Sequence, residues 1–386
     1  MTEVRKKQSL ETRVIHAGEC LPRIKGAISM PIFQSSTYES SREADYHTIP
    51  YLRLNNSPNH EALHRKLADL EQAESALVTA SGMAAITTAL LSVLKAGDHL
   101  LVQRGLYGGT HTYITHDLPE LGISFDFVDL HSAEDWAHKI KPNTRGFYVE
   151  SMTNPLLAVG DLSGVVEFAR EHGLITMIDN TLPSPVNFNP TTIGFDLVLH
   201  SCTKYLNGHS DIVAGAIIGR QDLVQKAKIK LDHLGATLDP HACFLLHRGI
   251  KTLSLRVARQ NKNALALAIF LEQLSAVSGV NYPGLVSHPD HQRAKSLFTG
   301  YGGLLSFAHV DGAEGAHAMI DRLELATEAV SLGGVETLIT IPAESTHAGL
   351  STEECEAFGI GASLVRLAVG IESEQDLIQD FASALQ

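Results

Sequence analysis

Cysteine is scarce in this sequence of 386 residues, and the few cysteines are far apart. The four, Cys20, Cys202, Cys243 and Cys355, form no C-x-x-C pair and have no zinc-like spacing. A disulfide framework is therefore not expected. The twenty histidines are scattered and include no H-E-x-x-H pair, so no metal site is predicted.

Positive charge is also scarce relative to negative charge. Thirty lysines and arginines stand against 43 aspartates and glutamates, which gives a formal net charge of −13. This excess argues against nucleic acid or an anionic membrane as a partner. The sequence lacks an apolar run long enough to span a membrane, and residues 1–7 lack the apolar core of a signal peptide. We therefore expect a cytoplasmic protein with no nucleic-acid or membrane partner.

Short apolar runs alternate with helical patterns through the middle of the chain. The strand-like runs are at residues 99–102, 123–130, 146–150, 174–178, 195–199 and 213–218. The helical patterns are at residues 61–72, 82–94 and 162–171, the last with Asp161 as a cap and Gly173 at its end. This alternation predicts an α/β fold, with a mainly parallel sheet covered by helices on both faces. Ligands of such sheets bind at the carboxyl ends of the strands.

The pattern changes near residue 246. A helical stretch at 248–274 leads to strand-like segments at 303–309 and 364–369, and then to a final helix that Ser373 can cap. The chain is long enough for two cores of different size. The predicted division is an N-terminal arm that contacts a neighbouring subunit (1–50), a large cofactor-binding domain (51–245) and a smaller C-terminal α/β domain (246–386).

A lysine stands at the end of one strand-like run. Lys204 follows residues 195–200 in the polar turn Ser-Cys-Thr-Lys-Tyr. Desolvation at such a position lowers the pKa of a lysine, and the free amine can attack a carbonyl group. Asp179 ends the preceding strand-like run, so both side chains are expected at one edge of the sheet. A carboxylate for a pyridine nitrogen and an amine for an aldehyde are what pyridoxal 5′-phosphate (PLP) requires. Taken singly, each residue is more typical of a solvated loop or turn.

Three other segments have both a functional and an ordinary interpretation. The sequence Ser81-Gly82-Met83 opens an apolar helix, and the N–H groups at a helix N-terminus suit a phosphate, although Ser81 is equally typical of a helix cap. Tyr107 lies in a glycine-rich turn, where an aromatic residue usually packs on the surface. Arg366 lies inside an apolar strand-like run and must be paired. Its partner is either the carboxylate of an amino-acid ligand or an internal acidic residue.

Together these motifs resemble one family, the PLP-dependent enzymes of cysteine and methionine metabolism. The matching segments, in order, are at residues 12–18, 27–38, 81–83, 106–110, 150–155, 179, 201–205, 331–334, 346–347 and 366–372. The resemblance implies a fold-type-I PLP-dependent transferase fold, with PLP as the cofactor and a small amino acid as the substrate. It also implies a homo-oligomer, namely a tetramer that is a dimer of dimers with shared active sites.

The resemblance assigns cofactor roles to residues of this chain. Lys204 would bind PLP and move protons, Tyr107 would stack on the pyridine ring and Asp179 would keep the ring nitrogen protonated. The other implied cofactor-binding residues are Ser81, Gly82, Met83, Thr181, Ser201 and Thr203. Tyr51 and Arg53 would reach the PLP phosphate of a neighbouring subunit, although the loop at 54–59 departs from the family pattern.

The substrate residues implied by the resemblance are Arg366 and Asn154 for the α-carboxylate and Ser331 for contact with Lys204. The predicted activity is that of a carbon–sulfur lyase. It performs γ-elimination on a sulfur amino acid, as cystathionine γ-lyase or methionine γ-lyase does, and releases an α-keto acid and ammonia. The alternative is γ-replacement, of the cystathionine γ-synthase or O-acetylhomoserine sulfhydrylase type. An aminotransferase and a non-catalytic binding protein are more distant alternatives.

Several positions bear on the substrate. Cystathionine-binding members usually carry an arginine where this chain has Thr112, and often a glutamate where it has Pro50. Methionine γ-lyases usually carry a cysteine where it has Gly109, whereas Glu336 and Thr337 resemble γ-specific members. We therefore expect a preference for substrates with a small or neutral distal group, such as methionine, homocysteine or O-acetylhomoserine.

Overall fold

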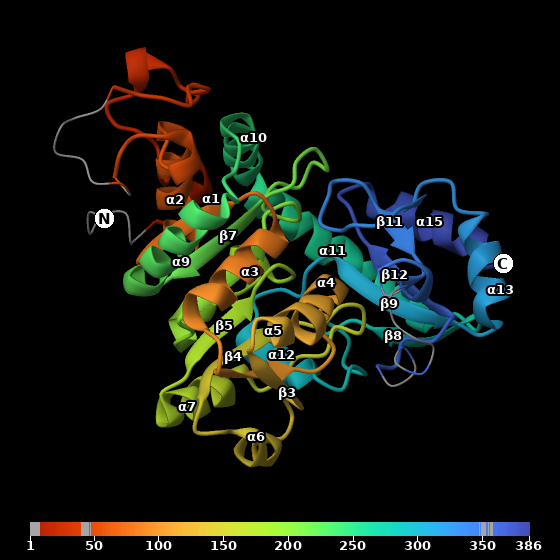
Figure 1. Cartoon of the computed structure of the whole chain (residues 1–386). Coiled ribbons are helices and arrows are strands. Elements are labelled where there is room, and N and C mark those ends of the chain that lie inside the picture. Colours follow the sequence, from red (N-terminus) through yellow and green to blue (C-terminus); the bar gives the residue numbers. More distant parts are fainter. Residues whose placement is uncertain are drawn as a thin grey trace.

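The computed structural model describes residues 8–39, 46, 48–346, 348, 353, 355 and 358–386. The described residues form two β-sheets surrounded by helices. In Figure 1 the larger sheet lies on the left and the smaller, mostly blue sheet on the right. The predicted α/β fold is confirmed.

Seven strands form the larger sheet. They are β1 (Ser75–Thr79), β2 (His99–Gln103), β3 (Ser124–Val128), β4 (Thr144–Glu150), β5 (Ile175–Asp179), β6 (Leu197–Ser201) and β7 (Gly215–Gly219). Their order across the sheet is β1-β7-β6-β5-β4-β2-β3. Strands β2 to β6 are parallel to one another, and β7 runs antiparallel to both of its neighbours, β1 and β6. The predicted parallel arrangement is correct, but the sequence did not predict β1.

Both faces of the larger sheet are buried, as is usual for parallel strands. Met177 and Ile178 are neighbours in β5 and belong to hydrophobic cores on opposite faces. One core includes residues of α3 (Gly82–Val93) and α9 (Gln221–Leu234). The other includes residues of α2 (Pro58–Leu70), α6 (Ala133–Lys139), α7 (Leu162–His172) and α10 (Pro240–Ile250). Three short helices are α4 (Gly108–Thr112), α5 (Leu118–Glu120) and α8 (Ser184–Asn187), with a π-helical turn at Tyr113–Asp117 between α4 and α5.

The capping signals in the sequence act as predicted. The carboxylate of Asp161 accepts the N–H of Gly164 at 2.9 Å and so begins α7. Gly173 ends that helix with a φ of 66°, a left-handed conformation that glycine adopts easily. Ser373 caps α15 (Glu374–Ala384) by accepting the N–H of Asp376 at 3.4 Å.

Five strands form the smaller sheet. They are β8 (Val277–Asn281), β9 (Leu304–His309), β10 (Thr327–Glu328), β11 (Leu338–Thr340) and β12 (Leu364–Ala368). Their order is β10-β11-β12-β9-β8, and all pairs except β10 with β11 are antiparallel. Its core includes residues of α13 (Gly312–Ile320), α15 and a long helix, α11 (Leu253–Glu272). The strand-like segments predicted at 303–309 and 364–369 correspond to β9 and β12.

The single helical stretch predicted at 248–274 is wrong, because α10 ends at Ile250 and α11 begins only after Thr252. Arg256, which is buried, provides the physical reason. Its guanidinium donates to the carbonyl of Gly249 in the last turn of α10 at 2.9 Å, and to that of Tyr205 at 2.8 Å. This tertiary contact satisfies a carbonyl at the break. The domain limits remain a prediction, and residues 245 and 246 both lie within α10.

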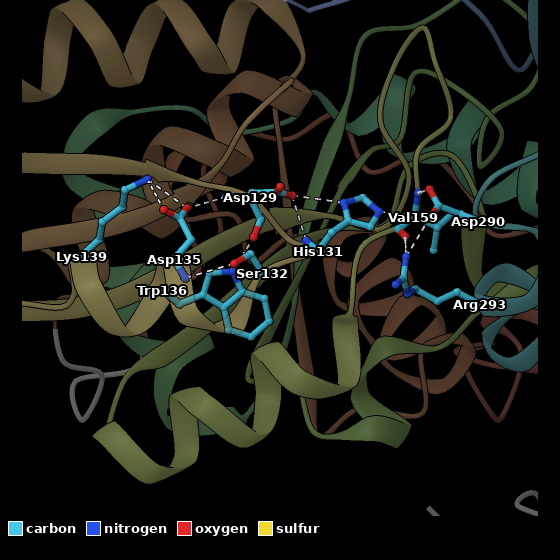
Figure 2. Close-up of polar contacts among 9 residues, drawn as sticks. All are labelled: Asp129, His131, Ser132, Asp135, Trp136, Lys139, Val159, Asp290 and Arg293. Atoms are coloured by element: carbon cyan, nitrogen blue, oxygen red, sulfur yellow. Dashed lines mark hydrogen bonds and ion pairs between the residues drawn. The ribbon is translucent and has the colours of Figure 1, made fainter.

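A polar network, drawn in Figure 2, ties Asp290 and Arg293 at the start of α12 (His291–Leu297) to the loops that follow β3 and β4. Asp290 accepts the N–H of Val159 at 2.9 Å, and its other oxygen lies 3.0 Å from Nε2 of His131. Arg293 donates to both Asp290 and the carbonyl of Val159, each at 2.8 Å. The segment before α12 is thereby fixed against the loops that follow β3 and β4.

The N-terminal segment contains a short helix, α1 (Leu10–His16), that the sequence did not predict. It packs against α2 and α11 of its own chain. Lys66 of α2 is buried and donates to the carbonyls of Val14 and Ile15 at 2.8 and 3.3 Å. Contact of the arm with a neighbouring subunit remains a prediction, and residues 1–7, 40–45 and 47 lie outside the described residues. Within the described part, no helix combines the length and apolarity needed to cross a membrane.

Candidate active site

A cavity of about 400 Å³ lies at the carboxyl ends of β4, β5 and β6, where they face the smaller sheet. Most of the predicted site residues line it: Ser81, Gly82, Met83, Tyr107, Asn154, Asp179, Thr181, Ser201, Thr203, Lys204, Ser331 and Arg366. The other lining residues are Ile86, Glu150, Met152, Leu182, Val213, Val330, Leu332 and Thr346. Of the predicted site residues, Tyr51 and Arg53 lie outside the described wall of this cavity.

Lys204 lies in the turn after β6. Its Nζ donates a hydrogen bond to the hydroxyl of Ser331 at 2.7 Å. Burial, and then the positive charge of Arg366, lower the pKa of Lys204 to about 8. A larger fraction of neutral amine is therefore present near neutral pH than for an ordinary lysine, as attack on an aldehyde requires.

Asp179 is the last residue of β5, and the turn after it holds its carboxylate. Oδ1 accepts hydrogen bonds from the N–H and the hydroxyl of Thr181, at 2.9 and 2.5 Å. Burial raises the pKa of Asp179, and the bonds from Thr181 oppose that rise. Among the described residues none donates to Oδ2, so this oxygen is available to a ligand. A cationic group there would favour the ionised carboxylate.

The N-terminus of α3 forms one wall of the cavity. Ser81 caps the helix, because its Oγ accepts the N–H of Ala84 at 3.0 Å. The N–H groups of Gly82 and Met83, in the first turn, have no acceptor within the helix and are available to an anion. A Cβ at position 82 would lie 2.8 Å from Cβ of Ser201, so only glycine allows this close approach of α3 to β6.

Two hydroxyl groups lie opposite this helix terminus. Thr203 Oγ1 accepts the N–H of Ala214 at 3.0 Å and donates to its carbonyl at 3.2 Å, which fixes the side chain. The hydroxyl of Ser201 has no hydrogen-bond partner among the described residues, and the side chain is partly exposed to the cavity. A hydroxyl with a free donor is suited to a phosphate oxygen.

Arg366 lies in the middle of β12 and is only 2% exposed. Its NH2 group donates to the carbonyl of Ser331 at 2.9 Å and its NH1 group to Oδ1 of Asn154 at 3.4 Å. Its Nε is buried and has no partner, and no described carboxylate forms an ion pair with it. Burial lowers the pKa of Arg366 to about 10. The internal ion pair is therefore not found in the described structure, and the positive charge of Arg366 faces a cavity that can hold a ligand carboxylate.

Ser331 contacts both basic residues of the cavity. Its hydroxyl accepts from Lys204, and its carbonyl accepts from Arg366. Its φ of 91° is unusual for a residue other than glycine. Such backbone strain is often found at functional sites.

Tyr51 and Arg53 are exposed and point to other partners in this chain. Arg53 donates to the carbonyl of Asp232 at 2.6 Å and to the hydroxyl of Tyr46 at 2.9 Å. The divergent loop between Arg53 and α2 is held by Asn55, which has a left-handed φ of 55° and donates to the carbonyl of Val78 at 2.6 Å. The predicted role of Tyr51 and Arg53 in a neighbouring subunit remains a prediction.

Sequence reasoning gave no role to Glu150, although it begins the segment 150–155. Glu150 ends β4, is 5% exposed and lines the cavity beside Asp179. Its Oε1 accepts the N–H of Tyr107 at 2.8 Å. Burial, and then the negative charge of Asp179, raise the pKa of Glu150 to about 8. In the sequence, Glu150 could have been identified because it ends a strand-like apolar run, as Asp179 does.

The positions that bear on the substrate in the sequence are not part of the described cavity wall. Thr112, which departs from the family pattern, and Glu336, which resembles γ-specific members, are both exposed. A Cβ at Gly109 would lie 2.8 Å from the ring of Tyr107, so the absence of a side chain at 109 gives that ring its present position.

Comparison with known proteins identifies the class of this chain. Residues 11–386 match the family described as Cys/Met metabolism PLP-dependent enzyme. The cystathionine gamma-lyase of Bacillus subtilis (strain 168) is 40% identical, with 97% of this chain and 99% of the relative covered. The cystathionine beta-lyase of Lactococcus lactis subsp. lactis (strain IL1403) is 40% identical, with 98% and 99% covered. The crystal structure of cystathionine gamma synthase from Xanthomonas oryzae pv. oryzae has a TM-score of 0.94 at 36% identity, and 98% of each chain is covered.

This chain therefore belongs to the PLP-dependent enzymes of cysteine and methionine metabolism. It is an enzyme, and PLP is its cofactor. The names of the three relatives describe different reactions, so the similarity establishes the family and not the particular reaction.

The geometry of the cavity fits PLP. The N-terminus of α3 and the free hydroxyl of Ser201 provide donors for a phosphate. Lys204 provides an amine with a lowered pKa, and the free Oδ2 of Asp179 provides an acceptor for a protonated ring nitrogen.

Proposed function

We propose that this enzyme is a carbon–sulfur lyase that performs γ-elimination on a sulfur amino acid and releases an α-keto acid and ammonia. The observation that carries the substrate part of this proposal is the distribution of charge around the cavity. Lys204 and Arg366 are the only basic residues among the described residues of its wall. Since Arg366 is assigned to the α-carboxylate, the described part of the wall contributes no basic side chain for a second carboxylate.

The remaining wall suits an uncharged distal group. It is formed largely by the apolar side chains of Met152, Leu182, Val213, Val330 and Leu332. A carboxylate buried against them would lack a hydrogen-bond partner, which costs at least about 1–3 kcal/mol. A thioether or an ester carries no such penalty. We therefore include methionine, homocysteine and O-acetylhomoserine among the preferred substrates.

Bound PLP supplies an electron sink for the charge that develops at the substrate Cα. In this proposal the residues of the chain provide the rest. The guanidinium of Arg366 binds and orients the α-carboxylate, with Asn154 beside it. Lys204 removes the Cα proton and transfers protons to and from Cβ, while Ser331 holds its Nζ. Asp179 keeps the ring nitrogen protonated.

The proposal extends to the assembly. Tyr51 and Arg53 serve the cavity of a neighbouring subunit, in a homotetramer that is a dimer of dimers. Their exposure and their distance from the cavity wall of their own chain support this assignment. We also propose a cytoplasmic location, because the relatives named above are enzymes of small-molecule metabolism.

A substrate panel tests the reaction. Purified enzyme is given methionine, homocysteine, cystathionine, cysteine, O-acetylhomoserine or O-succinylhomoserine, with and without an added thiol, and keto acid and ammonia are quantified. The proposal predicts a four-carbon keto acid and ammonia without added thiol. Product formation only with thiol would show γ-replacement instead, and a three-carbon keto acid from cystathionine would show β-elimination.

A further inference from the structure

The last residue of β4, Glu150, is fixed in place from three sides. It is in register with Asp179 of the adjacent parallel strand β5. Its own N–H donates to Oε1 of Gln103 at 2.7 Å, which ties it to β2. Its side-chain Oε1 accepts the N–H of Tyr107 at 2.8 Å. A buried carboxyl group held in this way has a defined position in the cavity wall.

The contact with Tyr107 matters because it fixes the N–H of that residue, whose carbonyl accepts the N–H of His111 at 2.9 Å. Tyr107 is 43% exposed and lies in the turn before the short helix α4. Gly108 and Gly109 follow it, and these residues add no side-chain contacts of their own. Among the described residues, Glu150 provides the side-chain hydrogen bond to the backbone of Tyr107. Glu150 therefore holds the backbone from which the ring extends, while the absence of a side chain at Gly109 leaves room for the ring.

Two carboxyl groups side by side are not both easily ionised in a buried site. Asp179 receives two hydrogen bonds from Thr181, whereas Glu150 receives one from Tyr107. The negative charge is therefore better stabilised on Asp179. Burial, and then the charge of Asp179, raise the pKa of Glu150 to about 8. This agrees with a negative charge on Asp179 and an uncharged Glu150.

We propose that Glu150 is a positioning residue that acts through Tyr107: its uncharged carboxyl group holds the tyrosine turn over the cofactor and leaves the negative charge to Asp179. This inference rests on the ring-stacking role proposed for Tyr107. Glu150 fixes the geometry of the Tyr107 turn and takes part in no step of the reaction.

A pair of variants separates the hydrogen bond from the charge. Glu150→Met keeps a similar length and removes the acceptor. Glu150→Gln keeps an acceptor oxygen and carries no charge. It should therefore keep the hydrogen bond to the Tyr107 N–H that the Glu150→Met variant loses. We expect the Kd for PLP, measured by titrating apoenzyme, to rise at least about tenfold in the Met variant and less than about threefold in the Gln variant. The circular dichroism band of bound PLP should change in the Glu150→Met variant and stay the same in the Glu150→Gln variant.

The pH profile provides a second readout. Above pH about 8, ionised Glu150 would place a second negative charge beside Asp179. The other titratable groups near it are Tyr148 on β4, Tyr107, and Lys204 and Arg366 across the cavity. We expect wild-type kcat to fall as Glu150 loses its proton, and this alkaline fall to be absent or displaced in Glu150→Gln.

Two outcomes would overturn the inference. If Gln impaired PLP binding and the dichroism band as strongly as Met, an ionised carboxylate would be required. If the Glu150→Met variant had a normal Kd for PLP and a normal dichroism band, Glu150 would not position Tyr107. Should Met fail to fold, Glu150→Asp shortens the side chain, and the same readouts should show an intermediate loss. Because the Kd for PLP and the dichroism band are measured without substrate, an error in the proposed reaction would not alter these two results.

Discussion

At the scale of single residues, the environment of Lys204 leads to a pH prediction. Its pKa is lowered from an ordinary value of 10.5 to about 8, so the neutral amine replaces the ammonium group as pH rises through about 8. The rate at which apoenzyme takes up PLP should increase about tenfold per unit below that pH and level off above it. Stopped-flow absorbance between about pH 7 and 10 measures this rate. A rate that continued to rise up to pH 10 would contradict the lowered pKa.

Arg366 leads to a second prediction. Replacement by lysine keeps the positive charge and removes the planar guanidinium, including the Nε that has no partner in the described structure. We expect Arg366→Lys to lower kcat/KM for amino-acid substrates about 100-fold, mainly through KM, since a charge-assisted hydrogen bond contributes about 1.5–3 kcal/mol. The absorbance of bound PLP serves as the control and should persist. An unchanged KM would show that Arg366 does not bind the substrate.

Some site residues can be recognised from the sequence because they lie at the ends of strand-like runs. Lys204 and Asp179 stood out because a charged residue follows an apolar run. Glu150 follows an apolar run as well, but its contact with the Tyr107 N–H depends on two segments more than forty residues apart. The strained φ of Ser331 is likewise imposed by its contacts and not by local sequence.

At the scale of elements, the docking of α3 against β6 creates the anion-binding wall. Gly82→Ala adds a Cβ only 2.8 Å from that of Ser201. Alanine is the better helix former, by about 1 kcal/mol, so a loss of function would have to come from displaced docking and not from a weaker helix. We expect the Kd for PLP to rise at least tenfold, which is a loss of about 1.4 kcal/mol of binding free energy. Gly361→Ala, with open space around its Cβ, is the matched control and should bind PLP normally.

The parallel strands could be predicted as elements because each is a short, continuous apolar run. Their carboxyl ends meet at one edge, and Asp179 and Lys204, expected together there, line the same cavity. Strand β10 has only two residues, both polar, and β8 contains a glycine, so neither carries a recognisable pattern. Arg256 lies at the break between α10 and α11, and its bond to the carbonyl of Tyr205, 51 positions away, is not encoded in the local sequence.

At the scale of the whole molecule, the cavity requires both sheets. Lys204 follows the larger sheet, whereas Arg366 belongs to the smaller one. The polar network of His131, Asp290 and Arg293 in Figure 2 fixes the segment before α12 against the larger sheet. The sequence predicted two parts of different size, but their packing arises from long-range contacts that no local pattern encodes.

The proposed shared sites lead to a prediction about assembly. Arg53→Ala and Lys204→Ala should each be nearly inactive alone. In a mixed dimer, one cavity would carry both changes and the other neither, so mixing should restore part of the activity. Subunits with different tags allow mixed dimers to be purified before assay. If verified mixed dimers remained inactive, Arg53 would act within its own chain.

The central claim is that a cavity with one carboxylate-binding arginine favours substrates with a neutral distal group. The most direct measurement is kcat/KM of the wild-type enzyme for cystathionine, methionine and O-acetylhomoserine, under the same conditions. We predict higher values for methionine or O-acetylhomoserine than for cystathionine, since burial of an unpaired carboxylate costs about 1–3 kcal/mol. A value for cystathionine at least about tenfold above both others, a difference of about 1.4 kcal/mol, would contradict the account.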